Sequence, residues 1–359
     1  MNKWNIGWGT VSACNMNCQF CYSRHKRKDS HDLGYEDWIH FIDENHAWIN
    51  TINYGTGENT LNPHWFRLVD YIRKNYPDIR QALTTNGYLS EAVADGFCKN
   101  AFINAIDEID VSLDYCDREK HTEFRGQPKA YEWAMNTLEL CRQYHKPATI
   151  VFLGSRKNLN RDNIDGLFAI AKKYNAILRM NMYRPTEGID EISERFIADY
   201  NTIIDIIKYI SEHYQILSLN DALFSTILTG KTIGDPSGDK SIRILADGSI
   251  TPSTYLIDAK YIVGNIQEKN VLSKLENEKS LEHIISEKIP EDCRECVYRE
   301  TCAGGVYDRR YLWYGDLNHK DPYCPQSFKA KNDAVIPIRK TDFHSVHDGY
   351  LPTMFFRPI

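Results

Sequence analysis

The sequence lacks the features of membrane-spanning, exported and nucleic-acid-binding proteins. It contains no apolar run of the roughly 18 residues that a membrane helix needs, and its first residues carry no apolar signal-peptide core. Its 43 Lys and Arg residues are outnumbered by 49 Asp and Glu residues, which argues against general binding to nucleic acid. Repeats and low-complexity tracts are absent as well. We therefore expect a cytoplasmic protein without a membrane or nucleic-acid partner.

Cysteine, by contrast, is plentiful, with ten residues among 359. Without an export signal, cysteines in a reducing compartment are metal ligands or free thiols rather than disulfides. The hydrophobic content of 42% and the charged content of 26% are ordinary for a globular protein. The length allows one large domain and a smaller one.

Three cysteines near the N-terminus form a C-x3-C-x2-C loop, namely Cys14, Cys18 and Cys21. A loop this tight can hold three thiolates on one face of an iron–sulfur cube, because thiolates are the preferred ligands of such clusters. Three ligands leave one iron open to a substrate or cofactor. The alternative is a structural zinc site, although zinc normally takes four ligands from paired units.

Strands and helices alternate through the first 215 residues. Apolar runs predict strands over 4–10, 49–54, 82–85, 109–114, 149–153 and 177–183, with helices over 35–45, 127–144 and 162–174 and another opening at Pro63. This alternation implies a parallel sheet, either a barrel or an open doubly wound sheet. A long helix over 196–214 then leads out of the sheet, and Asp247-Gly248 predicts a hairpin between 241–245 and 249–256.

The cysteine loop resembles that of the radical S-adenosylmethionine (SAM) superfamily, whose signature has this spacing. The resemblance implies an α/β fold with a partial (β/α)6 barrel similar to a TIM barrel. It also implies a [4Fe–4S] cluster on Cys14, Cys18 and Cys21, which binds SAM through its open iron. One electron from the cluster would then cleave SAM to a 5′-deoxyadenosyl radical that takes hydrogen from a substrate.

A Gly-Gly-Glu segment after the second strand meets the methionine amino group in this family, and the matching segment here is Thr56-Gly57-Glu58. The resemblance implies that the Glu58 carboxylate accepts from the ammonium group. Thr56 replaces the first glycine, a mild change if this position does not need a positive φ.

Further SAM contacts follow from the same resemblance. Ser112 and Asp114 would approach the ribose, Asn181 would lie near the cofactor, and Arg184 would reach the methionine carboxylate. Phe20 and Tyr22 would border the adenine, or would simply pack. Residues 121–126 resemble a segment common in the family, in which Arg125 contacts the cofactor or forms a structural ion pair.

A second cysteine group, C-x2-C-x5-C followed by one more cysteine, comprises Cys293, Cys296, Cys302 and Cys324. It resembles the SPASM/Twitch extension, a small α+β domain that carries auxiliary [4Fe–4S] clusters. A further SPASM cysteine is replaced here by Val306, and another is missing near residues 251–254. We therefore predict one auxiliary cluster with four thiolate ligands; the alternative is a zinc knuckle.

These assignments give three parts: a barrel with its bridging helix over 1–215, a SPASM/Twitch-like cluster domain over 216–330, and a C-terminal tail over 331–359 that packs on the barrel. Cys116 follows the fourth strand, and a thiol there could return a hydrogen atom to a substrate radical; an idle thiol is the alternative. His344 and His347 in the tail could line the cavity, although we favour surface or packing histidines.

The resemblance also suggests the substrate. SPASM/Twitch enzymes mostly modify ribosomally made precursor peptides by crosslinking, epimerisation or backbone excision. A minority oxidise or epimerise sugars or aminocyclitols. We favour a precursor peptide. Against this choice, only 13 residues precede Cys14, so the enzyme would need a separate leader-recognition protein or would dock the peptide directly. A flavodoxin or ferredoxin would supply electrons. A sulfatase-activating enzyme is disfavoured because that class carries two auxiliary clusters.

Overall fold

The computed structural model describes residues 3–24, 31–94, 96–186, 188–231, 235, 241–278, 289–325, 336–338, 343–348 and 350–359. Its centre is a sheet in which β1 to β6 run parallel and follow one another in chain order. These strands are β1 Trp4–Trp8, β2 Ile49–Tyr54, β3 Arg80–Thr85, β4 Glu108–Ser112, β5 Ala148–Gly154 and β6 Ile177–Met182.

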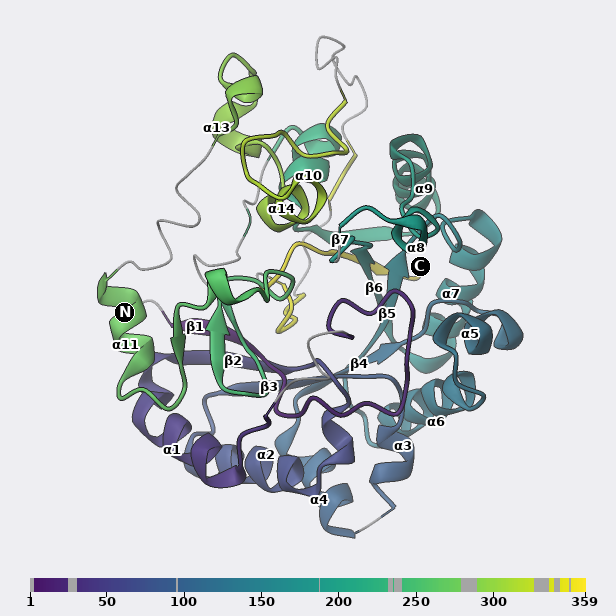
Figure 1. Ribbon diagram of the computed structural model, residues 1–359. Helices are drawn as coiled ribbons and strands as arrows, with labels where there is room; N and C mark the ends of the chain where they lie inside the picture. Colours follow the sequence, from purple (N-terminus) through teal and green to yellow (C-terminus); the bar gives the residue numbers. More distant parts are fainter. Residues whose placement is uncertain are drawn as a thin grey trace.

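Helices connect these strands and lie along the outer side of the curved sheet (Figure 1). They are α1 Tyr35–Asn45, α2 Pro63–Asn75, α3 Leu89–Ala92, α4 Gly96–Ala105, α5 Arg118–Arg125, α6 Ala130–Gln143 and α7 Arg161–Tyr174. Helices on the outer side only are typical of a partial barrel, whereas a doubly wound sheet is covered on both faces. The expected partial barrel is therefore confirmed. None of the described helices is long and apolar enough to cross a membrane.

Later elements extend the sheet at both edges, so that its described strands run in the order β10-β9-β8-β1-β2-β3-β4-β5-β6-β11-β7. The remaining described strands and α-helices are α8 Glu191–Glu194, α9 Tyr200–His213, β7 Gln215–Leu219, α10 Ala222–Thr229, β8 Ser241–Ile244, β9 Ser249–Thr251, β10 Gly264–Asn265, α11 Val271–Glu278, α13 Arg299–Cys302, α14 Tyr307–Tyr314 and β11 Met354–Arg357.

The predicted hairpin is confirmed, since β8 and β9 pair antiparallel around Asp247-Gly248, where Gly248 adopts a φ of 82°. Its placement was not predicted, because β8 also pairs parallel with β1 and so belongs to the barrel sheet. The helix predicted to begin at 196 begins at Tyr200 instead. Asp199 caps it by accepting a hydrogen bond from Thr202 N at 2.9 Å.

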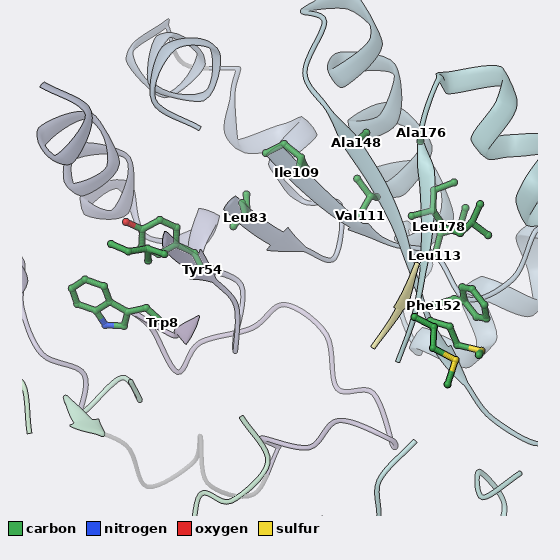
Figure 2. Close-up of a cluster of buried hydrophobic side chains, with 14 of the residues drawn as sticks. Trp8, Tyr54, Leu83, Ile109, Val111, Leu113, Ala148, Phe152, Ala176 and Leu178 are labelled. Atoms are coloured by element: carbon green, nitrogen blue, oxygen red, sulfur yellow. The ribbon is translucent and has the colours of Figure 1, made fainter. Parts of the chain in front are cut away.

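The two faces of the strands differ in chemistry. Successive strand residues point to opposite sides, and Figure 2 shows the apolar side chains of several neighbouring strands, including Ile109, Val111 and Leu178, gathered in one cluster. Between Ile109 and Val111, Asp110 turns to the lumen, where it pairs with Arg179 at 3.0 Å. The barrel therefore encloses a polar interior.

Arg309 ties the C-terminal part of the chain to the barrel. This arginine on α14 is fully buried and contacts Asp221, the N-cap of α10, at 2.6 Å and Asp321 at 2.5 Å. Its neighbour Asp308 accepts from Arg184, just after β6, at 2.8 Å. Two adjacent residues of one helix thus reach the sheet and the loop that leads to Cys324.

We expect Arg309→Met to destabilise the protein by about 3–5 kcal/mol, because it leaves two aspartates buried without their cation. Urea unfolding would measure this change. Arg142→Met removes an exposed pair with Glu139 and should leave the urea midpoint close to that of the wild type. Equal losses in both variants would contradict the assigned role of Arg309.

Residues 343–348 and 350–359 complete the barrel on the side of β6. The strand β11 lies antiparallel between β6 and β7, and the preceding turn carries His347, which contacts Asp110 at 2.7 Å. His347 is 1% exposed, so its interpretation as a packing residue holds in part, whereas a surface position is wrong. Glu108 accepts a hydrogen bond from the backbone of Val346 in the same turn.

The burial of Glu108 makes stability depend on pH. Burial, and then the nearby charge of Asp110, raise the pKa of Glu108 from 4.5 to about 7. The contribution of Glu108 to stability is complete below pH 4.5 and is lost as pH rises through about 7. Urea unfolding between pH 5 and 8 should therefore show Glu108→Gln gaining about 2 kcal/mol relative to the wild type as pH rises.

The exposed Glu132→Gln is the matched control and should follow the wild-type pH profile, since Glu132 is half-exposed in its pair with Arg118. If the Glu108→Gln profile also runs parallel to the wild type, Glu108 is not the group that titrates.

Candidate active site

A cavity of about 210 Å³ opens at the carboxyl ends of the barrel strands. Residues that end or follow β1 to β6 line it, together with residues after β9 and the turn before β11. Carboxyl ends of parallel strands are where barrel enzymes place their active sites. Its wall brings together twelve residues singled out from the sequence: Cys14, Cys18, Phe20, Cys21, Tyr22, Thr56, Gly57, Ser112, Arg125, Asn181, Arg184 and His347.

The three cysteines of the N-terminal loop all lie on this wall. The loop is closed by a hydrogen bond from Cys21 N to Cys18 O at 3.2 Å, and Asn86 Nδ2 lies 3.8 Å from Cys14 Sγ. Burial raises the pKa of Cys18 to about 11, although the Arg125 charge opposes this shift. No three acidic, histidine or cysteine side chains in the described ranges converge on a single metal ion. A cube does not require such convergence, since each thiolate binds its own iron.

The turn after β2 supports the cysteine loop through its backbone. Gly57 has a φ of 64°, and a Cβ there would stand 2.5 Å from Val11 O and 2.6 Å from Ala13 O. Glu58 N donates to Ala13 O at 2.8 Å. Only glycine fits so close an approach.

Thr56 departs from the expectation of a mild substitution, because its φ is 76°. A β-branched residue rarely adopts this conformation, which costs on the order of 1–3 kcal/mol. Its hydroxyl is hydrogen-bonded to Tyr22 Oη at 2.5 Å and to Arg243. These bonds offset the strain and place Thr56 on the cavity wall.

Glu58 lies behind the wall rather than on it. Its carboxylate is fully buried and accepts from Thr60 Oγ1 at 2.6 Å, Thr85 Oγ1 at 3.0 Å and Asn86 N at 2.8 Å. Burial raises its pKa despite these bonds. This position corrects the expected direct contact with an ammonium group, because the carboxylate positions the turns after β2 and β3 instead.

Asp114 likewise stands one layer back, whereas Ser112 lines the cavity. The strand β4 ends at Ser112, and Asp114 Oδ2 accepts from Arg125 Nε at 2.6 Å. Arg125 itself reaches the wall, next to Cys18, with its guanidinium 5.1 Å from the centre of the Phe20 ring. The expected ribose contact of Asp114 is thus replaced by the positioning of Arg125.

Arg184 lines the cavity but is already paired. Its Nε donates to Asp308 at 2.8 Å, its guanidinium lies over Tyr255 at 4.3 Å, and Nη2 is buried without a hydrogen-bond partner. Asn181 also lines the cavity, and its Oδ1 accepts from Thr353 Oγ1 at 2.7 Å.

The two aromatic residues beside Cys21 take different neighbours. Phe20 stacks on Phe124 at 4.4 Å between ring centres, and Tyr22 meets Tyr255 edge-on at 5.2 Å. Both rings also line the cavity, so packing and contact with a ligand are compatible.

Cys116 lies outside the cavity, which corrects the hydrogen-donor hypothesis. The chain has left the barrel rim by this residue, and a Cβ on Gly166 of α7 would meet Cys116 Sγ at 2.3 Å. A thiol packed on an outer helix cannot reach a radical inside the barrel.

The second cysteine group surrounds a separate small cavity lined by Cys293, Cys296, Cys302 and Cys324. Burial raises the pKa of Cys324 to about 12, and the charges of Cys293 and Asp321 add to this effect. Val306, where a further cysteine was missing, is buried and donates through its backbone to Asp321 at 3.1 Å.

Sequence patterns missed Arg243 and Arg179 on the cavity wall. The two arginines sit in strands, and no local motif marks them. One available signal was Gly7 in β1 and Gly9 just after it, because a Cβ on either would stand 3.0 or 2.8 Å from the Arg243 guanidinium. A glycine in a strand indicates close approach by another group.

Gly57→Ala should displace the cysteine loop, because both a clash with backbone and a positive φ oppose it. We expect a loss of about 2 kcal/mol or more in urea unfolding, together with reduced iron uptake on anaerobic reconstitution. Gly230→Ala is the matched control, since its φ of 68° is similar and nothing stands within 4 Å of its Cβ. Equal losses in the two variants would show that strain alone, and not the contact with the loop, explains the effect.

Comparison with known proteins agrees with this geometry. Residues 9–168 match the family model described as the radical SAM superfamily. The AdoMet-dependent heme synthase of Methanosarcina barkeri is 26% identical over 343 residues, covering 89% of this chain and 95% of that protein. Mycofactocin maturase MftC of Mycolicibacterium smegmatis is 24% identical over 348 residues, covering 90% and 83%.

Among solved structures, Streptococcus suis SuiB bound to its precursor peptide SuiA aligns with a TM-score of 0.69 and 15% identity. The alignment covers 90% of this chain and 76% of SuiB, and it shows a shared fold. The matched family model begins just before the cysteine loop and contains the Thr56-Gly57-Glu58 turn. Residues 9–168 of this chain therefore form a radical SAM domain, and the chain is an enzyme.

Proposed function

We propose that this enzyme modifies a ribosomally made precursor peptide by radical chemistry in the barrel cavity. The observation that carries the proposal is one wall that bears three loop cysteines and four arginines, Arg125, Arg179, Arg184 and Arg243. Cys14, Cys18 and Cys21 would hold the SAM-binding [4Fe–4S] cluster. When bound, the cluster and SAM supply a carbon-centred radical that removes hydrogen from the substrate.

The chain's own residues would bind and orient the cofactor. Arg125 and Arg184 offer guanidinium groups to the methionine carboxylate, with Asp114 and Asp308 fixing their positions. The backbone of Thr56 and Gly57, backed by Glu58, borders the amino end. Ser112 and Asn181 offer polar contacts toward the ribose, and Phe20 and Tyr22 offer rings toward the adenine.

The second cysteine group would hold one auxiliary [4Fe–4S] cluster on Cys293, Cys296, Cys302 and Cys324. Four thiolates leave no open iron, so this cluster would transfer electrons or close the C-terminal part, and substrate would not bind it. Its small cavity is lined by none of the barrel residues described above. A reduced flavodoxin or ferredoxin would supply the electron.

A peptide substrate is supported by two of the similar proteins. One of them carries the name mycofactocin maturase, and the structure of the other, SuiB, was solved with a bound precursor peptide. The heme synthase similarity favours a second candidate, a haem precursor. Anaerobic incubation with short peptides encoded beside the gene, and separately with haem precursors, would distinguish them. A mass change in the peptide with matching 5′-deoxyadenosine supports the first, and a change only in the tetrapyrrole overturns it.

Iron content tests the two cluster assignments. After anaerobic reconstitution we expect about eight irons per chain, and about four in Cys18→Ala and in Cys302→Ala. With dithionite and SAM, Cys18→Ala should release no 5′-deoxyadenosine, whereas Cys302→Ala should retain release because its cavity is separate. Cys116→Ser is the control and should match the wild type in both measurements. Bound zinc, or release by Cys18→Ala, would contradict the assignments.

A further inference from the structure

The positive charges on the cavity wall are not all balanced. Of its four arginines, Arg125 pairs with Asp114, Arg179 with Asp110 and Arg184 with Asp308. Arg243 has no acidic partner within the residues that the structure describes. Moreover, neither aspartate nor glutamate occurs among the described residues that line the cavity. One unit of positive charge is therefore left over.

Arg243 is buried, and its Nε–H group has no hydrogen-bond partner. The residue is 1% exposed, and its Nη2 donates to Gly55 O at 2.6 Å and to Thr56 Oγ1. Its Nε is buried without a hydrogen-bond partner. A buried guanidinium without a counter-ion is costly, so the fold retains a group whose partner comes from outside the chain.

Glycines and hydroxyl groups surround the Arg243 guanidinium. Gly7 of β1 and Gly9 just after this strand supply no side chains, and a Cβ on Gly7 would overlap the Tyr350 hydroxyl as well as crowd Arg243. Tyr350 Oη in turn lies 2.7 Å from Thr254 Oγ1. The guanidinium therefore faces hydroxyl groups that can also donate to an anion.

The Nε–H of Arg243, which has no partner, can donate a charge-assisted hydrogen bond to a carboxylate oxygen. The carboxylate of the cofactor is the less suitable ligand, because Arg125 already stands beside Cys18, whereas Arg243 contacts Thr56, which is hydrogen-bonded to Tyr22. A thiolate-bound cluster and a sulfonium cofactor also carry net charges of opposite sign, which cancel each other. The positive charge of Arg243 is therefore left for the substrate.

We propose that Arg243, assisted by Tyr350, binds a carboxylate group of the substrate in the barrel cavity. This inference rests on the proposed function and deepens it. The preferred peptide presents an acidic side chain or its C-terminal carboxylate to Arg243 when the reacting carbon enters the cavity.

The test uses glutarate as a carboxylate probe and glutaramide, its neutral diamide, as the control ligand. Saturating glutarate should raise the Tm of the reconstituted wild type by about 2 °C or more, because a ligand that binds only the folded state stabilises it. Glutaramide should have no effect. Arg243→Gln should abolish the glutarate response, whereas Arg142→Gln, which removes an exposed arginine, should preserve it.

Tyr350→Phe keeps the charge and the fold, and should weaken glutarate binding about tenfold through loss of one hydrogen bond to a charged group. A glutarate response that persists in Arg243→Gln, is matched by glutaramide or is missing from the wild type overturns the proposal. Loss of SAM binding in Arg243→Gln would also overturn the proposal, because it would show that this arginine binds the cofactor. Release of 5′-deoxyadenosine is measured separately, so failure of the proposed radical chemistry is distinguishable from failure of this site.

Discussion

The site depends on a backbone contact with no room for a side chain. At Gly57 the turn after β2 approaches the carbonyl groups of Val11 and Ala13, and the next residue closes a hydrogen bond to the same loop. The loop that carries the three cysteines has little regular structure of its own. Its shape is imposed from β2, and through the buried Glu58 from β3, so the cysteines inherit the rigidity of the sheet.

The same sheet serves two purposes through the alternation of its side chains. Apolar residues pack outward against the helices, while Asp110, Arg179 and their neighbours make the interior polar. Most buried parallel strands are apolar on both faces. Here the inward charges are held in pairs, and these pairs fix long arginine side chains at the wall. Rigid arginines around a small cavity bind anionic groups with little loss of side-chain entropy.

The sequence predicted what is local. The cysteine spacings, the strand–helix alternation and the Asp247-Gly248 hairpin follow from short patterns, and the structure agrees with each placement. Pairings between distant residues left no such pattern: Arg184 meets Asp308 across 124 positions. Cys116 was misjudged because β4 ends two residues earlier than expected. The condition for a mild substitution at Thr56 could not be checked from the sequence, because a positive φ at threonine has no sequence signature apart from the glycine it replaces.

The insertion of β11 between β6 and β7 has a consequence for how the barrel assembles. Thr353 donates to Met180 across 173 positions of sequence, and the adjoining turn supplies His347 and Tyr350 to the cavity. Contacts of such separation form late and slowly during folding. The cavity is therefore complete only after this C-terminal turn has packed against the barrel. A nascent chain could bind iron at the early cysteine loop before it is able to enclose a ligand.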